Sequence, residues 1–228
     1  MEILNAYFWT LFHPWHMHRH FQKRGEGMML FEKPLHHLEL KEVLLVSWIF
    51  VFMKGIIDFA AILLKVSWAQ ILFKNTMPAV YDLLGSNWQG ALVQVSTFKS
   101  IAVEVLAFPV ALVLTYFLWL GLFKLFFLFL DYVPSHNYFQ GLSHEALIKQ
   151  RNAIIKDIIV FALTSQFFVF IPLIGNLISA LAFFFLMYVG MKVRLDLRTR
   201  DMIFFFGVPV IFIYGILFLV TIAGLLLN

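Results

Sequence analysis

Two oppositely charged residues interrupt the first long apolar segment of the chain, residues 43–64. Lys54 and Asp58 are four residues apart, so on a helix they share one face and can form an ion pair. Glu104 lies in the next apolar segment, 101–130, and completes a polar network if it turns towards Lys54. Ionisable groups within a membrane commonly mark a substrate, ion or partner site, so we predict an intramembrane polar site at Lys54, Asp58 and Glu104. The alternatives are a structural ion pair that locks helix packing and, for Glu104, contact with water.

A second cluster, of histidines, lies near the N-terminus. His16 and His20 are four residues apart and present two imidazoles on one helical face, with His13 just before them. Imidazole is the commonest metal ligand, so His13, His16 and His20 are candidate metal ligands. A dedicated site normally adds a carboxylate or a third histidine at a defined spacing, with supporting partners. The pattern therefore favours adventitious metal binding or a pH-responsive cationic surface on anionic lipid, and we expect no cofactor.

The basic residues Arg194, Arg198 and Arg200 follow the fourth apolar segment and are interleaved with acidic residues. A sequence of this kind is typically a solvated loop that sets the orientation of a membrane protein. The interleaved acids could also give pairing specificity to a cytoplasmic partner. These three arginines are therefore our candidates for a loop that contacts a partner or lipid.

No catalytic motif is present. The sequence contains no G-x-x-x-x-G-K-[ST], no H-E-x-x-H and no G-x-S-x-G. Ser143, His144 and Glu145 are neighbours in sequence and do not by that fact converge as a triad, so we interpret Ser143 as the cap that begins a helix. We therefore predict that the chain is not an enzyme.

Apolar residues dominate the composition. Of 228 residues, 62% are hydrophobic and 13% are charged, whereas about a quarter are charged in a typical soluble domain. An apolar helix of about 20 residues crosses the hydrocarbon of a bilayer. The sequence thus predicts an all-α, polytopic membrane bundle in residues 41–228, with five spans near 43–64, 101–130, 153–172, 175–192 and 202–227.

Residues 1–40 form a cytoplasmic or interfacial segment in this interpretation. Leu4, Phe8, Leu11 and Trp15 recur at helical spacing and could sink as one amphipathic stripe into the headgroup boundary. Pro14 suits the first turn of a second short helix, because the N–H that it lacks has no partner there.

The third and fourth spans follow from a break in one apolar tract that is too long for a single crossing. Pro172 removes a backbone donor and Gly175 permits a tight reversal, so we predict a helical hairpin that spans fully, with a shallow re-entrant hairpin as the alternative. Basic residues precede the first, third and fifth spans, which predicts a cytoplasmic N-terminus and an outside C-terminus.

Several phrases of the sequence resemble the Yip1 family of membrane proteins, in its prokaryotic form. The C-terminal half contains Phe170-Ile-Pro-Leu-Ile-Gly175, then Tyr188-Val-Gly-Met-Lys192, then a short charged loop and a final span with Pro209. The N-terminal phrase Leu11-Phe-His-Pro14, followed by Phe21, is similar to the opening of prokaryotic members. The long polar tail of eukaryotic Golgi members is absent, which favours a prokaryotic plasma (inner) membrane.

The resemblance implies five membrane helices, no enzymatic activity, and a role in organising membrane components or as an accessory subunit of a transport complex. The implied partners are membrane lipids and other membrane subunits or further copies of the chain, without nucleic acid. The rival hypothesis is a small transporter for lipid, metal or peptide that uses Lys54, Asp58 and Glu104 as its polar core.

Overall fold

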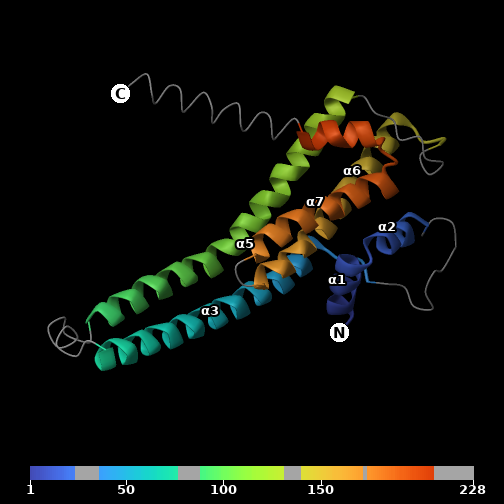
Figure 1. The fold of residues 1–228 in the computed structure, drawn as a ribbon. Coiled ribbons are helices and arrows are strands. Elements are labelled where there is room, and N and C mark those ends of the chain that lie inside the picture. Colours follow the sequence, from blue (N-terminus) through green and yellow to red (C-terminus); the bar gives the residue numbers. More distant parts are fainter. Residues whose placement is uncertain (24–35, 77–87, 131–139, 172–173, 208–228) are drawn as a thin grey trace, which may run out of the picture.

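This computed structural model describes residues 1–23, 36–76, 88–130, 140–171 and 174–207, and these residues fold mainly into helices (Figure 1). The helices are α1 (Glu2–Phe12), α2 (Pro14–Lys23), α3 (Leu40–Thr76), α5 (Trp88–Leu130), α6 (His144–Leu163), the 3₁₀ helix η2 (Thr164–Phe170) and α7 (Gly175–Arg194), followed by a helical segment at 199–207. No strand occurs in these described ranges. The all-helical class predicted from the sequence is therefore confirmed.

Four helical stretches are long and apolar enough to cross a membrane: Leu40–Leu64, Phe98–Leu128, His144–Phe170 and Gly175–Arg194. The predicted fifth span is helical over 202–207, and the rest of it lies outside the described residues. The third stretch begins well before the predicted start at residue 153, because the helix capped by Ser143 and the span are one continuous element. The Ser143 hydroxyl accepts a hydrogen bond from the Ala146 N–H at 3.3 Å.

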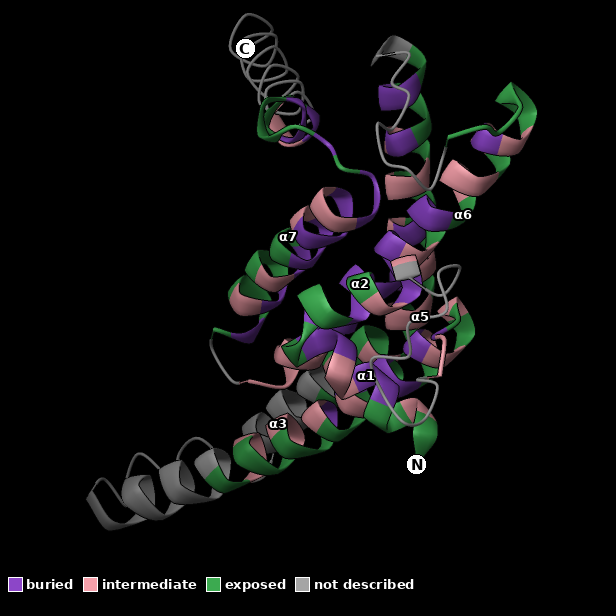
Figure 2. Cartoon of the chain, turned by 90° about the vertical axis from the view of Figure 1, so that its right-hand side faces the viewer, coloured by how far each residue is buried: buried purple, intermediate pink, exposed green. Residues whose placement is uncertain are grey.

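The helices α3 and α5 run side by side as a long pair that extends beyond the other helices (Figure 1). With 37 residues, α3 is about 55 Å long, which exceeds a hydrocarbon core of about 30 Å. At the other end of the pair, α6 and α7 pack together, and α1 and α2 lie against them. The helix α6 contributes much of the buried core, including Ile154, Ile155, Ile158 and Phe161, and Figure 2 shows that it is exposed at its N-terminal end and buried towards its C-terminal end.

The face of the first helix that packs against the protein includes part of the predicted stripe. Ala6, Tyr7 and Thr10 are fully buried. Of the stripe, Leu11 is buried and Phe8 is partly buried, whereas Leu4 and Trp15 are exposed. The Tyr7 hydroxyl donates to the Thr164 carbonyl and pairs with the Ser47 hydroxyl, each at 2.9 Å. Burial raises the pKa of Tyr7, so the hydroxyl stays protonated and joins α1 to α3 and η2. Pro14 begins α2, as the sequence predicted.

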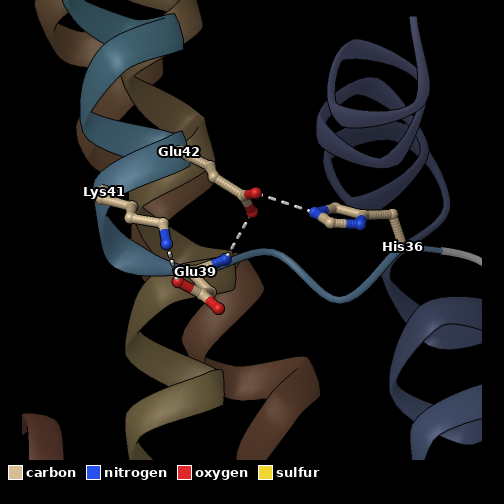
Figure 3. Close-up of polar contacts among 4 residues, drawn as sticks. All are labelled: His36, Glu39, Lys41 and Glu42. Atoms are coloured by element: carbon tan, nitrogen blue, oxygen red, sulfur yellow. Dashed lines mark hydrogen bonds and ion pairs between the residues drawn. The ribbon is translucent and has the colours of Figure 1, made fainter.

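One half of a capping box begins α3, as Figure 3 shows, with the Glu42 side chain reaching back to Glu39. The Glu42 carboxylate accepts the backbone N–H of Glu39 at 2.9 Å and lies 2.9 Å from Nε2 of His36. Lys41 pairs with Glu39 at 2.8 Å. These contacts fix the point where the N-terminal segment turns into α3, because they satisfy a backbone donor that a helix start otherwise leaves unpaired.

The proline inside α5 is matched by a contact from α3. Pro109 lacks an N–H, so the Val105 carbonyl four residues earlier has no helical partner. The Trp48 indole Nε1–H donates to this carbonyl at 2.9 Å. Figure 1 shows α5 changing direction in its middle. The proline thus both bends α5 and creates an acceptor that α3 fills, because a freed backbone carbonyl in hydrocarbon must find another donor.

Candidate functional site

The three predicted intramembrane residues lie together. Lys54 Nζ is 2.8 Å from Asp58 Oδ2 on the same helix and 3.1 Å from Glu104 Oε1 on α5. Lys54 therefore bridges two carboxylates from two helices, and Glu104 turns towards Lys54. We refer to Lys54, Asp58 and Glu104 as the intramembrane triad.

The triad lies at the surface of the α3–α5 pair. The side chain of Lys54 is 18% exposed, that of Asp58 is 35% exposed and that of Glu104 is 52% exposed. Sites that conduct ions or bind substrate in membrane proteins usually face a bundle interior or a water-filled cavity. The carboxylates of Asp58 and Glu104 instead face outward, towards the surroundings of the α3–α5 pair.

An apolar cavity of about 400 Å³ lies between the same two helices. It is lined by Phe52, Gly55, Ile56 and Phe59 of α3 and by Phe98, Ile101, Ala102, Val105 and Leu106 of α5. No triad residue lines this cavity. A β-carbon at Gly55 would lie 3.0 Å from the Ile101 side chain and 3.1 Å from that of Val105, so this glycine allows the two helices to approach closely.

A second charged cluster, which the sequence analysis did not identify, lies where α2 meets α6 and α7. Arg194 Nη1 is 2.8 Å from Asp157 Oδ2, and His37 Nε2 is 3.2 Å from Asp157 Oδ1. Asp157, Arg194 and His37 thus join α6, α7 and the segment that precedes α3. The sequence did contain a signal for this cluster: Asp157 is an acidic residue within a candidate span, and such residues are expected to have a partner.

His18 of α2 is buried beside this cluster. It is fully buried, neither ring nitrogen has a hydrogen-bond partner, and its ring lies 5.3 Å from that of Phe161. Burial, reinforced by the positive charge of Arg194 and opposed by Asp157, lowers the pKa of His18 to about 3. The imidazole is therefore neutral at neutral pH.

Gly190 makes room for this histidine. A β-carbon at Gly190 would lie 2.9 Å from Cε1 of His18 and 2.8 Å from the Ile158 side chain. Phe21, one turn of α2 further on, packs against Phe161 and His37, with ring centroids 5.6 Å and 5.0 Å apart. The contact between α2 and α7 thus depends on a residue without a side chain.

The three candidate arginines do not form one loop. Arg194 is in the last turn of α7 and only 6% exposed, so it is not the solvated loop residue that the sequence predicted. It is buried because Asp157 neutralises it. Arg198 and Arg200 are exposed, as expected of a loop that contacts solvent, lipid or a partner.

The candidate metal ligands do not converge. His13 stacks on Trp9 with ring centroids 4.1 Å apart, and its centroid is 6.4 Å from that of His16. Among the residues that the structure describes, no group of three or more histidine and carboxylate side chains could hold a metal ion. The structure thus gives His13, His16 and His20 no common site: His13 is the C-cap of α1, where its ring stacks on Trp9, whereas His16 and His20 belong to α2.

The hairpin between the third and fourth stretches has a second glycine in a close contact. A β-carbon at Gly175 would clash with the carbonyl oxygen of Phe168, and the Gly175 N–H donates to the Ile171 carbonyl at 3.0 Å. Pro172 lies outside the described residues. Gly175 thus allows α7 to approach the backbone of η2 closely, which differs from the backbone freedom that the sequence analysis assigned to it.

The described residues contain four helical stretches that are long and apolar enough to cross a membrane. A polytopic membrane protein requires helices of this kind. Comparisons with family models, curated proteins and solved structures found no match.

Proposed function

We propose that this chain is a non-catalytic integral membrane protein that organises membrane components or serves as an accessory subunit of a membrane transport complex. The observation that carries the proposal is the position of the intramembrane triad on the outside of the α3–α5 pair. An ionised carboxylate that faces hydrocarbon costs at least a few kcal/mol. A partner that covers the triad removes this cost, whereas an isolated carrier needs its charges in an enclosed polar path.

The resemblance to the Yip1 family supports the same role. Gly190, from the phrase Tyr188–Lys192, contacts His18, which follows the similar N-terminal phrase. Gly175, from the phrase that ends the hairpin, contacts the backbone of η2. The resembling phrases thus lie at helix contacts, which suits residues that maintain a fold rather than carry out a reaction.

The proposed location is the inner (plasma) membrane, with the N-terminus in the cytoplasm, a fifth span in 202–227 and the C-terminus outside. The contact of His18 in α2 with the end of α7 supports this topology, because it brings the N-terminal segment to the same side as Arg198 and Arg200. The positive-inside rule then assigns that common side to the cytoplasm.

A small transporter for lipid, metal or peptide is the second candidate. It is favoured by the bridge that Lys54 makes between acids on two helices, since paired charges of this kind also occur on ion and substrate pathways. It predicts flux by the purified chain alone, in liposomes.

The test is purification of the untagged chain from its own host in mild detergent, followed by mass spectrometry of the proteins that accompany it. The subunit hypothesis predicts a stoichiometric membrane partner and no autonomous flux in liposomes. The transporter hypothesis predicts flux that Asp58→Asn abolishes while assembly is unchanged. A chain that purifies alone and shows no flux contradicts both.

A further inference from the structure

The intramembrane triad carries an excess negative charge. Lys54 is one cation and Asp58 and Glu104 are two anions, so their sum is −1. One ammonium group cannot neutralise two carboxylates, and the side chain of Glu104 remains 52% exposed while it contacts Lys54. An ion that complements this group must therefore be positive.

The depth of the two acids decides what kind of cation can reach them. Asp58 and Glu104 lie at least six residues inside the candidate spans Leu40–Leu64 and Phe98–Leu128 on the side of the α3–α5 connection, and there α3 continues to Thr76 and α5 begins at Trp88. At 1.5 Å per residue, both carboxylates are about 9 Å or more from those limits. The ammonium of a lipid headgroup lies at the surface of the bilayer. A cation at this depth is most readily supplied by the side chain of another membrane-spanning helix.

Three small side chains lie on the same exposed face of α5 as Glu104. They are Ser100, four residues before Glu104, and Ala107 and Ala111, three and seven residues after it. At this spacing the four residues share one helical face, and all four are exposed. Ala61 of α3, three residues after Asp58, is exposed as well. Small residues four apart, such as Ala107 and Ala111, allow the backbones of two membrane helices to approach closely.

We propose that the triad and this small-residue face form a docking surface for a transmembrane helix of a partner protein that carries an arginine or lysine within the hydrocarbon. The small residues let the partner helix approach, and its cation pairs with Glu104 and Asp58. This inference rests on the proposed role as a subunit and specifies the chemistry of the partner.

The test uses synthetic leucine–alanine peptides of about 22 residues, long enough to span, with one variable residue about 9 Å from one end. The variable residue is Arg, Gln or Glu. Binding to the purified full-length chain is measured by energy transfer in phosphatidylcholine vesicles. A polar contact between membrane helices corresponds to roughly tenfold in affinity, so we expect the Arg peptide to bind about tenfold tighter than the Gln peptide.

Variants of the triad should move this preference in opposite directions. Glu104→Gln makes the triad neutral and should abolish the preference for Arg, whereas Lys54→Gln leaves two unneutralised acids and should increase it. Glu145→Gln, at an exposed carboxylate elsewhere, is the matched charge control and should have no effect. Because the two triad variants predict opposite changes, simple misfolding cannot mimic both.

A steric pair tests the small-residue face without changing any charge. Ala107→Leu should weaken binding of the Arg peptide, and Ala60→Leu, which makes the same enlargement at an exposed residue of α3 on a face away from Asp58, should not. Equal effects of the two substitutions contradict the proposed surface.

Other occupants give different results. Equal binding of the Arg and Gln peptides, tighter binding of the Glu peptide, or a preference that persists in Glu104→Gln overturns the proposal. If added phosphatidylethanolamine removes the Arg preference, the occupant is a lipid, and if cross-linking through this face captures only a second copy, it is the chain itself. A native partner that still co-purifies with Glu104→Gln refutes the docking surface but leaves the proposed function intact.

Discussion

Acidification should release α2 from the bundle through His18. In the docked state its imidazole is buried without a hydrogen-bond partner, within the electrostatic reach of Arg194 of α7 and Asp157 of α6. Asp157 also contacts His37 of the segment before α3. Burial holds the pKa of His18 at about 3, against 6.5 for an exposed histidine. A proton on His18 would therefore bring an unpaired positive charge next to Arg194.

The sign and size of the effect follow from linkage. Between pH 6.5 and pH 3, His18 binds a proton when α2 is undocked but not when α2 is docked. The free energy that favours the docked state is therefore largest above pH 6.5 and decreases as the pH falls. Each pH unit in this window changes the free energy by about 1.4 kcal/mol. From pH 7 to pH 5 the docked state should therefore lose about 2 kcal/mol relative to the undocked state.

Hydrogen exchange of the α2 amides in detergent micelles, read by mass spectrometry at several pH values after correction for intrinsic exchange rates, measures this loss. His18→Leu should remove the pH dependence. It should also strengthen docking by about 1–3 kcal/mol, because it removes a buried polar group without partners. His16→Gln, at an exposed imidazole of the same helix, is the matched control and should retain the wild-type dependence.

The measurement should be repeated in His37→Gln, which removes the second imidazole next to Asp157 and so isolates the effect of His18 on the protection of α2. Protection of α2 that stays constant from pH 7 to pH 5 in the otherwise wild-type chain would refute the reasoning. So would an equal dependence in His18→Leu.

Two further substitutions test helix contacts. Gly190→Ala should destabilise the chain by about 1–3 kcal/mol and expose α2, because the added β-carbon lies 2.8 Å from Ile158. Gly121→Ala is the control: a β-carbon there has no atom within 4 Å, so this substitution should stabilise the chain by up to about 1 kcal/mol. Denaturant titration in mixed micelles compares the two, and equal effects contradict the close contact. Trp48→Phe should cost about 1 kcal/mol through the orphaned Val105 carbonyl, and much less in a Pro109→Ala background, where the helix restores its own donor. Additive effects in this double-mutant cycle would show that the indole does not satisfy that carbonyl.

The local features of the fold were predictable from the sequence. The four candidate spans cover the first four predicted segments, and the third begins earlier than predicted, because the hydrophobicity of a segment alone decides whether it suits a bilayer. Ser143 as a helix cap and Pro14 in a first turn were also predictable, since these roles depend on neighbours in the sequence.

The interactions between helices needed the tertiary structure. Sequence spacing places Lys54 and Asp58 on one face, but only the packing of α3 against α5 turns Glu104 towards Lys54. Arg194 has the sequence context of a solvated loop and is buried, because Asp157, 37 residues earlier, lies opposite it. The direction in which a helix presents each side chain depends on how it rotates and packs against its neighbours, and those contacts are distant in the chain. Composition thus determined that the chain suits a membrane, and packing decided which of its charges are paired, buried or exposed.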